Sequence, residues 1–374
     1  SPNACRVICT LEADASSGQR AASPHGVYGF SALTGRARAA LDSVMSTPPA
    51  PGLRTTAPLE TDVAVIGAGA AGLAIAAALA HPARRLSLVV LEPRAITPNP
   101  RRWLIAAEPG HGLIDLADAA FDSVALAGAR HDLPRVRIHH VRAGAFQQRA
   151  LERLADSPLA RIEEGVRIGD ITGKPGAVSV ETSVGALTAR AVIDTRPGPA
   201  AVAPGSWTQI AYAGVLDQVA APPGFSLSRA FSDRGGVGLD QTLVLPTGEA
   251  LIEAVRFAPP GQKGTGVEAR AAALAERLGG DPQQVALRRL VMPLSDVKPA
   301  DAPGPAIAAR AGLGGLRFSV GTAAVRLTRW ADGAAARFAE TGRITGPPGP
   351  PAQARAASAL ALSRLQQGSH AAAA

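Results

Sequence analysis

Short apolar runs alternate with segments of helical periodicity over most of the chain. Apolar or alternating runs bounded by turn residues predict strands at residues 62–69, 86–93, 160–171, 177–184, 186–197, 207–216, 241–248, 249–259 and 315–324. Helical spacing of apolar positions predicts helices at residues 70–81, 144–156, 266–278 and 325–340. A strand–helix–strand start, an antiparallel insert and a late return to the first unit are typical of a two-lobed α/β protein.

The segment DVAVIGAGAAGLAIAAALA, residues 62–80, carries the strongest chemical signal. Gly67, Gly69 and Gly72 have the spacing G-x-G-x-x-G between an apolar strand and an alanine-rich helix. The first glycine permits the tight turn, the second lets a pyrophosphate approach the backbone, and the third lets the helix pack close to the strand. Glu92 ends the next predicted strand, where a carboxylate binds ribose hydroxyls. The segment therefore predicts a dinucleotide site.

A second segment, LTARAVIDTRPGP, follows about 120 residues later. A strand of this type that returns to a first Rossmann unit is typical of flavoproteins, so FAD is favoured over NAD(P). The predicted fold class is α/β, a Rossmann-like FAD-binding domain with an inserted antiparallel-sheet substrate domain. The expected ranges are a flexible N-terminal extension at 1–58, the FAD-binding domain at 59–145, 146–200 and 301–345, the substrate domain at 201–300, and a low-complexity tail at 346–374. Met45 is the expected natural start.

The chain resembles the bacterial lycopene β-cyclase family of flavoproteins in several pieces between about residues 61 and 340. The glycine turn with VVLEPR is similar to the family's amino-terminal FAD motif, and AVIDTRPGP is similar to its Val-Ile-Asp-x-Arg-Gly strand. PNPRRWLI keeps part of an Asn-Asp-Arg-x-Trp word in Asn99, Arg102 and Trp103. LVLPTGEALIEAVRF and GLRFSVGTAAVRLTRW are similar to a later Leu-Ile-Glu segment and to the carboxy-terminal flavin segment. The order and spacing of these pieces together make the resemblance.

The resemblance implies cyclisation of the acyclic ends of lycopene into β-rings without net redox change. It also implies reduced FAD as the active cofactor and NAD(P)H as the reductant. Protonating an isolated alkene requires a positioned acid in a dry cavity, and a buried carboxyl with a raised pKa can be that acid. By position in the family, Glu253 is the acid/base candidate. Arg102, Asp194 and Gly321 would join Gly67, Gly69, Gly72 and Glu92 in binding FAD.

The carboxy-terminal flavin segment departs from the family pattern. About ten residues of the usual loop, including its Gly-Tyr portion, are missing after Gly321, because SVGTAA runs directly into VRLTRW. Aromatic residues make up only 3% of the chain, which leaves few ring walls for a polyene tunnel. The alternatives are therefore an FAD-dependent monooxygenase or oxidoreductase acting on an apolar small molecule, or a degenerate relative without catalysis.

Composition narrows the partners and the compartment. The formal charge is +8, but the basic residues are dispersed and aromatic residues are few, so nucleic acid is not an expected partner. A basic face at an anionic membrane surface fits better, with lycopene or a related carotenoid as the substrate. Cys5 and Cys9 are the only cysteines, and no apolar run spans a bilayer. We therefore expect a cytoplasmic protein at the inner face of the membrane.

Other polar groups give weaker signals. His139 and His140 are adjacent on a predicted strand, so their side chains should point to opposite faces and not form a metal pair. Asp233 and Asp240 flank a glycine-rich segment that predicts a turn. No His, Cys, Asp or Glu cluster has metal-ligand spacing, and no metal is expected.

Overall fold

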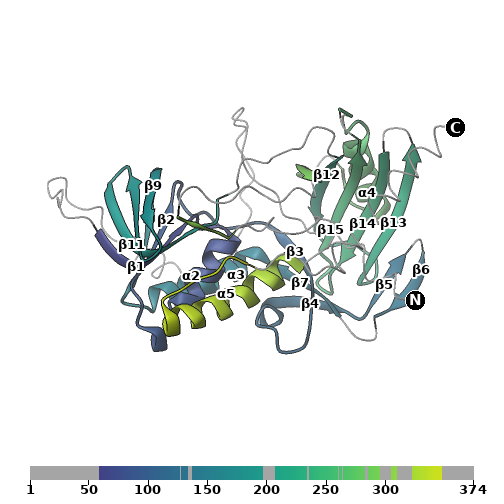
Figure 1. Ribbon diagram of the computed structural model, residues 1–374. Coiled ribbons are helices and arrows are strands. Elements are labelled where there is room, and N and C mark those ends of the chain that lie inside the picture. Colours follow the sequence, from purple (N-terminus) through teal and green to yellow (C-terminus); the bar gives the residue numbers. More distant parts are fainter. Residues whose placement is uncertain are drawn as a thin grey trace.

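The computed structural model describes residues 59–126, 128–133, 137–196, 207–233, 236–259, 261–262, 264–282, 285–294, 305–309 and 322–347. The expected N-terminal extension at 1–58, nearly all of the expected tail and most of the late strand predicted at 315–324 lie outside the described residues. The described part forms three sheets with helices packed against them (Figure 1). This arrangement confirms the α/β class.

The first sheet contains the glycine-rich unit. Its strands lie in the order β8 (Ala160–Glu164), β2 (Leu88–Glu92), β1 (Leu59–Ile66), β11 (Gly185–Asp194), β10 (Ala177–Thr182) and β9 (Ile168–Lys174), and β17 (Ile307–Ala308) also pairs with β11. The four strands β8, β2, β1 and β11 are parallel. The strand predicted at 186–197 to return to the first unit is β11, and it lies directly beside β1.

Helices cover one face of this sheet. They are α2 (Ala70–Leu79), α3 (Ala143–Ala155) and α5 (Thr322–Thr341), and they lie together beneath the sheet in Figure 1. Val63 and Val65 of β1 contribute to the core on the helix side, whereas Ala64 and Ile66 contribute to a second core on the other face. Burial on both faces explains why the second half of the strand, residues 63–66, is apolar at every position.

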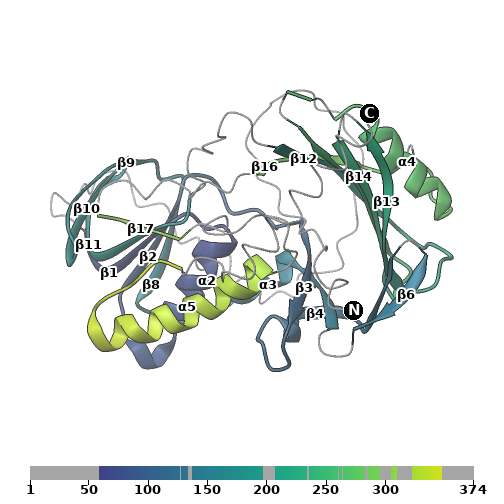
Figure 2. The ribbon, with the colours of Figure 1, turned by 45° about the vertical axis from the view of Figure 1, so that its right-hand side comes forward.

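The large sheet is built mainly from antiparallel strands. Its order is β16 (Arg288–Leu294), β12 (Trp207–Leu216), β15 (Ala250–Ala258), β14 (Gly236–Val244), β13 (Gly224–Asp233), β5 (Ser123–Leu126) and β6 (Ala129–Asp132). Helix α4 (Val267–Arg277) packs on one face, the outer one in Figure 2. Asp233 and Gly236 are paired at the end of β13 and β14. The last three residues of the glycine-rich segment that predicts a turn lie in β14 instead, and its residues 234–235 lie outside the described residues.

A small sheet lies between the two larger ones (Figure 2). It consists of β3 (Arg102–Ala107), β7 (Arg137–Arg142) and β4 (Ala117–Phe121). Leu104 and Ile138 pack into the same core as Leu251 and Val255 of β15, so this sheet supports the inner face of the large one. The range 59–145, expected to belong to the FAD-binding domain, therefore contributes strands to all three sheets.

Several elements differ from the sequence prediction. Residues 322–324, predicted as the end of a strand, are instead the start of α5, and strands β3, β4, β5, β6, β13 and β16 were not predicted. The single strand predicted at 160–171 is wrong, because Gly165 adopts a positive φ of 71° and separates β8 from β9. These two strands then lie at opposite edges of the first sheet. Strand β14 begins at Gly236, five residues before the predicted start at 241. The helices predicted at 70–81, 144–156 and 266–278 are confirmed to within two residues of their ends.

Candidate functional site

The glycine turn joins β1 to α2. Backbone conformation and packing within the protein require two of its glycines, Gly67 and Gly72. Gly67 has φ +99°, and its N–H donates to the Leu91 carbonyl at 2.8 Å. A Cβ at Gly67 would lie 2.7 Å from Thr195 Oγ1, and a Cβ at Gly72 would lie 1.8 Å from the Gly67 carbonyl oxygen. Gly67 and Gly72 therefore permit the tight turn and the close approach of helix and strand.

Gly69 has a different role. It is the N-cap of α2 with φ −71° and ψ −178°, a conformation open to any residue, and a Cβ there would meet nothing within 4 Å. The helix has no side-chain cap, and the N–H groups of its first turn have no intrahelical acceptor. The backbone at Gly69 thus faces open space at a helix N-terminus, which fits the pyrophosphate of a dinucleotide.

Two acidic residues lie at the same carboxyl edge of the first sheet. Glu92 Oε2 accepts the Ala68 N–H at 2.7 Å, so its carboxylate is held against the glycine turn. Asp194 pairs with Ile66 in the parallel register, is 1% exposed, and accepts hydrogen bonds from the backbone and guanidinium of Arg196. The structure brings Glu92, Asp194 and the glycine turn together, as the sequence predicts.

Thr195 supports this edge, and the sequence analysis did not single it out. Its hydroxyl donates to the Ile66 carbonyl at 2.8 Å and lies 3.2 Å from the Gly67 carbonyl. The side chain therefore ties the end of β11 to the turn after β1. The signal was present in the segment AVIDTRPGP, in which Thr195 follows the last residue of the returning strand.

Arg102 is placed elsewhere than the resemblance implies. Its guanidinium lies 2.9 Å from Glu249 Oε1 and donates to Glu249 Oε2 at 3.1 Å, and none of its described contacts is with the glycine turn. Trp103 points to the opposite face of β3, where it packs in a core with Ala324 and Val325 of α5. Its indole nitrogen is buried without a partner among the described residues.

The Arg102–Glu249 pair joins the small sheet to the large sheet. Both side chains are 17% exposed, and Arg142 extends the network to Asp118, which also bonds His140 Nδ1. We expect Glu249→Ala to lower the free energy of unfolding by about 1–3 kcal/mol, because the partly buried guanidinium loses its partner.

Urea denaturation measures this effect. The matched control is Glu163→Ala, because the Arg161–Glu163 pair is exposed on both sides and separated by 3.8 Å. Its loss should cost less than about 1 kcal/mol. Equal effects of the two variants would show that the inter-sheet pair does not hold the sheets together.

Glu253 lies on β15, on the inner face of the large sheet. Its side chain is 2% exposed, and neither carboxyl oxygen has a hydrogen-bond partner among the described residues. Leu251 and Val255 flank it on the same face. Burial raises the pKa of Glu253 to about 8, so this carboxyl holds its proton at neutral pH.

The raised pKa of Glu253 predicts a pH-dependent stability. The folded state binds this proton more tightly than the unfolded chain, so the stabilisation is full below about pH 4.5 and is lost as the pH rises through about 8. In this window the wild type should lose up to about 1.4 kcal/mol of unfolding free energy per pH unit relative to Glu253→Gln. Denaturant unfolding of both proteins from about pH 5 to about pH 9 measures the difference. Parallel pH profiles would contradict a buried, protonated Glu253.

The histidine pair behaves as its position on a strand predicts. His139 pairs with Ile105 and His140 with Leu104, so the two rings point to opposite faces of the small sheet. Asp240 faces α4, where it forms ion pairs with Arg270 and Arg277. Within the described ranges, no group of three or more His, Cys, Asp or Glu residues could hold a metal ion. Gly321, expected to contact the flavin, lies outside the described residues.

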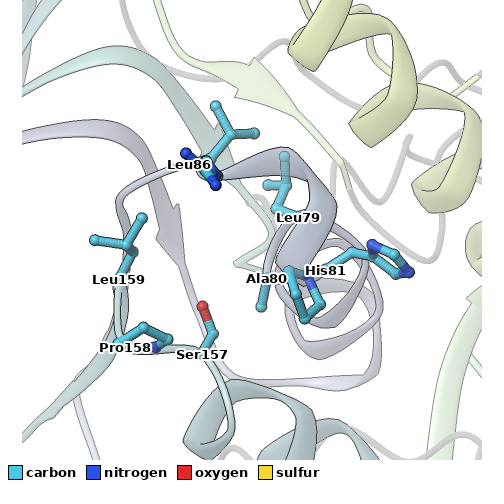
Figure 3. A pocket seen from close by; sticks show the side chains of 9 residues that line it. Leu79, Ala80, His81, Leu86, Ser157, Pro158 and Leu159 are labelled. Carbon is cyan, nitrogen blue, oxygen red and sulfur yellow. The ribbon is translucent and has the colours of Figure 1, made fainter.

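A pocket of about 360 Å³ lies at the other end of α2. Pro158 and Leu159, which precede β8, face Leu79 and Ala80 at the end of the helix (Figure 3). This is the amino edge of the parallel strands, whereas dinucleotides bind at the carboxyl edge. The pocket is therefore separate from the glycine turn.

Several solved flavoprotein structures are similar to this chain. A p-nitrophenol 4-monooxygenase from Pseudomonas putida DLL-E4 is 17% identical, with coverage of 76% of this chain and 82% of that chain and a TM-score of 0.57. A geranylgeranyl bacteriochlorophyll reductase-like protein from Thermoplasma acidophilum is 11% identical, with coverage of 83% and 85% and a TM-score of 0.54. Aklavinone-11 hydroxylase, solved with FAD and aklavinone, is 14% identical, with coverage of 76% and 63% and a TM-score of 0.55. At these identities the likeness shows the fold.

The sequence matches cover a smaller part of the chain than the structural matches do. None of the curated proteins compared with the chain matches it. Residues 62–231 match the family model described as lycopene cyclase protein, from β1 into β13 and short of Glu253 on β15. The chain is therefore similar to this family over less than half of its length, and it shares the fold of the solved flavoproteins.

Proposed function

We propose that the protein binds FAD at the glycine turn and uses Glu253 to cyclise the ends of an acyclic carotenoid such as lycopene. The observation that carries the proposal is the buried carboxyl of Glu253, which lies between Leu251 and Val255 and has no hydrogen-bond partner among the described residues. Retaining such a group without a partner costs about 1–3 kcal/mol, which favours a chemical role over a structural one.

The FAD assignment is supported by the geometry of the turn. The open space at Gly69 admits a pyrophosphate, and the free first-turn N–H groups of α2 would donate to it. Glu92 would accept hydrogen bonds from the ribose hydroxyls, because the backbone N–H groups of Ala68 and Arg94 hold its two carboxylate oxygens at this edge of the sheet. Asp194 and Thr195 hold the adjoining edge of the sheet.

In the proposed reaction the protonated Glu253 gives its proton to the terminal double bond of the substrate. The next double bond attacks the resulting carbocation and closes the ring. The Glu253 carboxylate then removes a ring proton, so that the net change is an isomerisation. When bound, reduced FAD supplies a negative charge that stabilises the cation. Leu251 and Val255 beside Glu253 exclude water that would otherwise quench the cation.

A second candidate is an FAD-dependent monooxygenase or oxidoreductase acting on an apolar molecule. The likeness to the fold of p-nitrophenol 4-monooxygenase favours it. So do Gln209 and Gln241, two buried amides on the Glu253 face with atoms that no described residue partners. A non-catalytic relative is the third reading, because α5 begins at Thr322 and leaves no room for the longer family loop after Gly321.

The product formed and the amount of NADPH consumed per product distinguish these three functions. The purified protein, loaded with FAD and reduced by NADPH without oxygen, is given lycopene in lipid vesicles. A cyclase makes cyclic carotenoid without consuming NADPH in proportion to product. Oxygenated product formed only in air, with one NADPH consumed per turnover, would replace the cyclase by the monooxygenase. Bound FAD with neither product would support the non-catalytic relative.

We also propose that the protein works at the cytoplasmic membrane surface, because a carotenoid dissolves only in lipid. No helix in the described part of the chain is long and apolar enough to cross a bilayer. The formal charge of +8 favours anionic lipid. Cosedimentation with anionic vesicles should be strong at low salt and fall as salt rises, with neutral vesicles as the control. Absence of binding at low salt would exclude this mode of association.

A further inference from the structure

Gln241 lies directly opposite Glu253 in the large sheet. The antiparallel register pairs Gln241 of β14 with Glu253 of β15, so both side chains are on the same face. Gln241 is 4% exposed, and its Oε1 has no partner among the described residues. Two carboxyl oxygens and one amide oxygen are therefore buried side by side, and none of them accepts a hydrogen bond from a described residue.

Uncharged residues surround this pair on its own sheet. Leu239 and Leu243 flank Gln241, and Leu227 of β13 pairs with it on the outer side. On the other side of Glu253 the paired residue is Ala213 of β12. Arg288 of β16 pairs with Ala213 in turn, so it is the nearest cation along this line of cross-strand neighbours, and it is exposed.

The small sheet packs against the same face, and its charged groups have other partners. Arg102 is paired with Glu249, and Arg142 with Asp118. His140 also bonds Asp118 through Nδ1, while its buried Nε2 has no partner in the described part of the chain. No described group donates a hydrogen bond to either Glu253 oxygen or to Gln241 Oε1. The pair itself carries the Glu253 carboxyl proton and the Gln241 amide N–H groups, and of these only the carboxyl proton can be donated to Gln241 Oε1.

We propose that Gln241 is a positioning residue whose amide oxygen accepts the proton carried by Glu253. Cross-strand neighbours have Cβ atoms about 5 Å apart, so a rotation of either flexible side chain closes this hydrogen bond. The bond satisfies two of the three buried oxygens, keeps Glu253 protonated, and fixes the direction of its O–H. Its value for catalysis rests on the proposed function, but the bond itself does not.

Infrared difference spectroscopy of the FAD-loaded protein tests the bond directly. The protonated Glu253 carboxyl gives a C=O stretching band that is assigned by its loss in Glu253→Gln. In Gln241→Leu this band should move to higher frequency, because the carboxyl loses its acceptor. Gln209→Leu is the matched control, because Gln209 is also a buried amide on this face but pairs with Phe257, four positions from Glu253 along β15. An unmoved band in Gln241→Leu, or an equal movement in both variants, would overturn the proposal.

Turnover provides a second measurement. Gln241→Leu should lower kcat about tenfold and leave KM nearly unchanged. The alkaline limb of the pH–rate profile should move to lower pH, because the bond that keeps Glu253 protonated is lost. Gln241→Asn, which keeps an amide oxygen, should restore part of the loss. If the leucine variant does not fold, Gln241→Met, which removes the amide and keeps the length of the side chain, replaces it in the infrared test. A band shift in a protein that makes no cyclic carotenoid would refute the proposed function and leave the Gln241 bond standing. Cyclic carotenoid formed by the wild type, together with an unmoved band in the variant, would support the proposed function and refute the Gln241 bond.

Discussion

Glu253→Gln should abolish cyclisation while leaving FAD bound. Glutamine keeps the size and shape of the buried side chain but has no transferable proton, so the alkene loses its acid. Losing a general acid lowers the rate by about 10²–10⁴-fold. The measurement is cyclic carotenoid formed by equal amounts of FAD-loaded wild type and variant, with flavin absorbance recorded for each.

Glu268→Gln is the matched control for this substitution. Glu268 lies exposed at the start of α4, on the opposite side of the large sheet from the Glu253 face. It should retain full cyclisation and full flavin absorbance. A Glu253→Gln variant that converts lycopene at near the wild-type rate would show that the acid is a different group.

Gly69→Leu should remove FAD and leave the fold intact. The structure allows a Cβ at this position, because nothing lies within 4 Å and the backbone conformation suits any residue. The leucine side chain would instead occupy the space of the pyrophosphate. We expect a loss of at least about 100-fold in FAD affinity, close to 3 kcal/mol, with a nearly unchanged unfolding transition.

Two other glycines make this prediction specific. A Cβ at Gly333 on α5 would also meet nothing within 4 Å, so Gly333→Leu should keep its FAD. Gly72→Ala should lower stability by about 1–3 kcal/mol, because its Cβ would overlap the Gly67 carbonyl oxygen. Calorimetry and flavin titration on all three variants separate the outcomes. Normal FAD affinity in Gly69→Leu would mean that the cofactor lies elsewhere.

Local patterns in the sequence correctly predicted the elements around the glycine turn in the first sheet. The strand at 62–69, the helix at 70–81 and the returning strand at 186–197 appear as β1, α2 and β11, since each is a continuous apolar or periodic run. The break at Gly165 was missed, because the sequence 160–171 alternates on both sides of a residue whose positive φ is visible only in the structure.

The chemistry of the site was predictable only in part. Glu253 could be found from its position in the family resemblance, and the structure buries it between Leu251 and Val255. Its neighbour Gln241 could not, because the register of β14 against β15 depends on the whole sheet. The same holds for Arg102, whose partner Glu249 is 147 residues away in the sequence.

Pigment analysis in a lycopene-accumulating bacterium tests the central claim most directly. Cells expressing the wild type should convert red lycopene to cyclic carotenoid, and cells expressing equal amounts of Glu253→Gln should retain lycopene. Flavin bound to both purified proteins would confirm that the difference lies in proton transfer and not in cofactor loading. Unchanged lycopene in cells containing FAD-loaded wild-type protein would contradict the cyclase function.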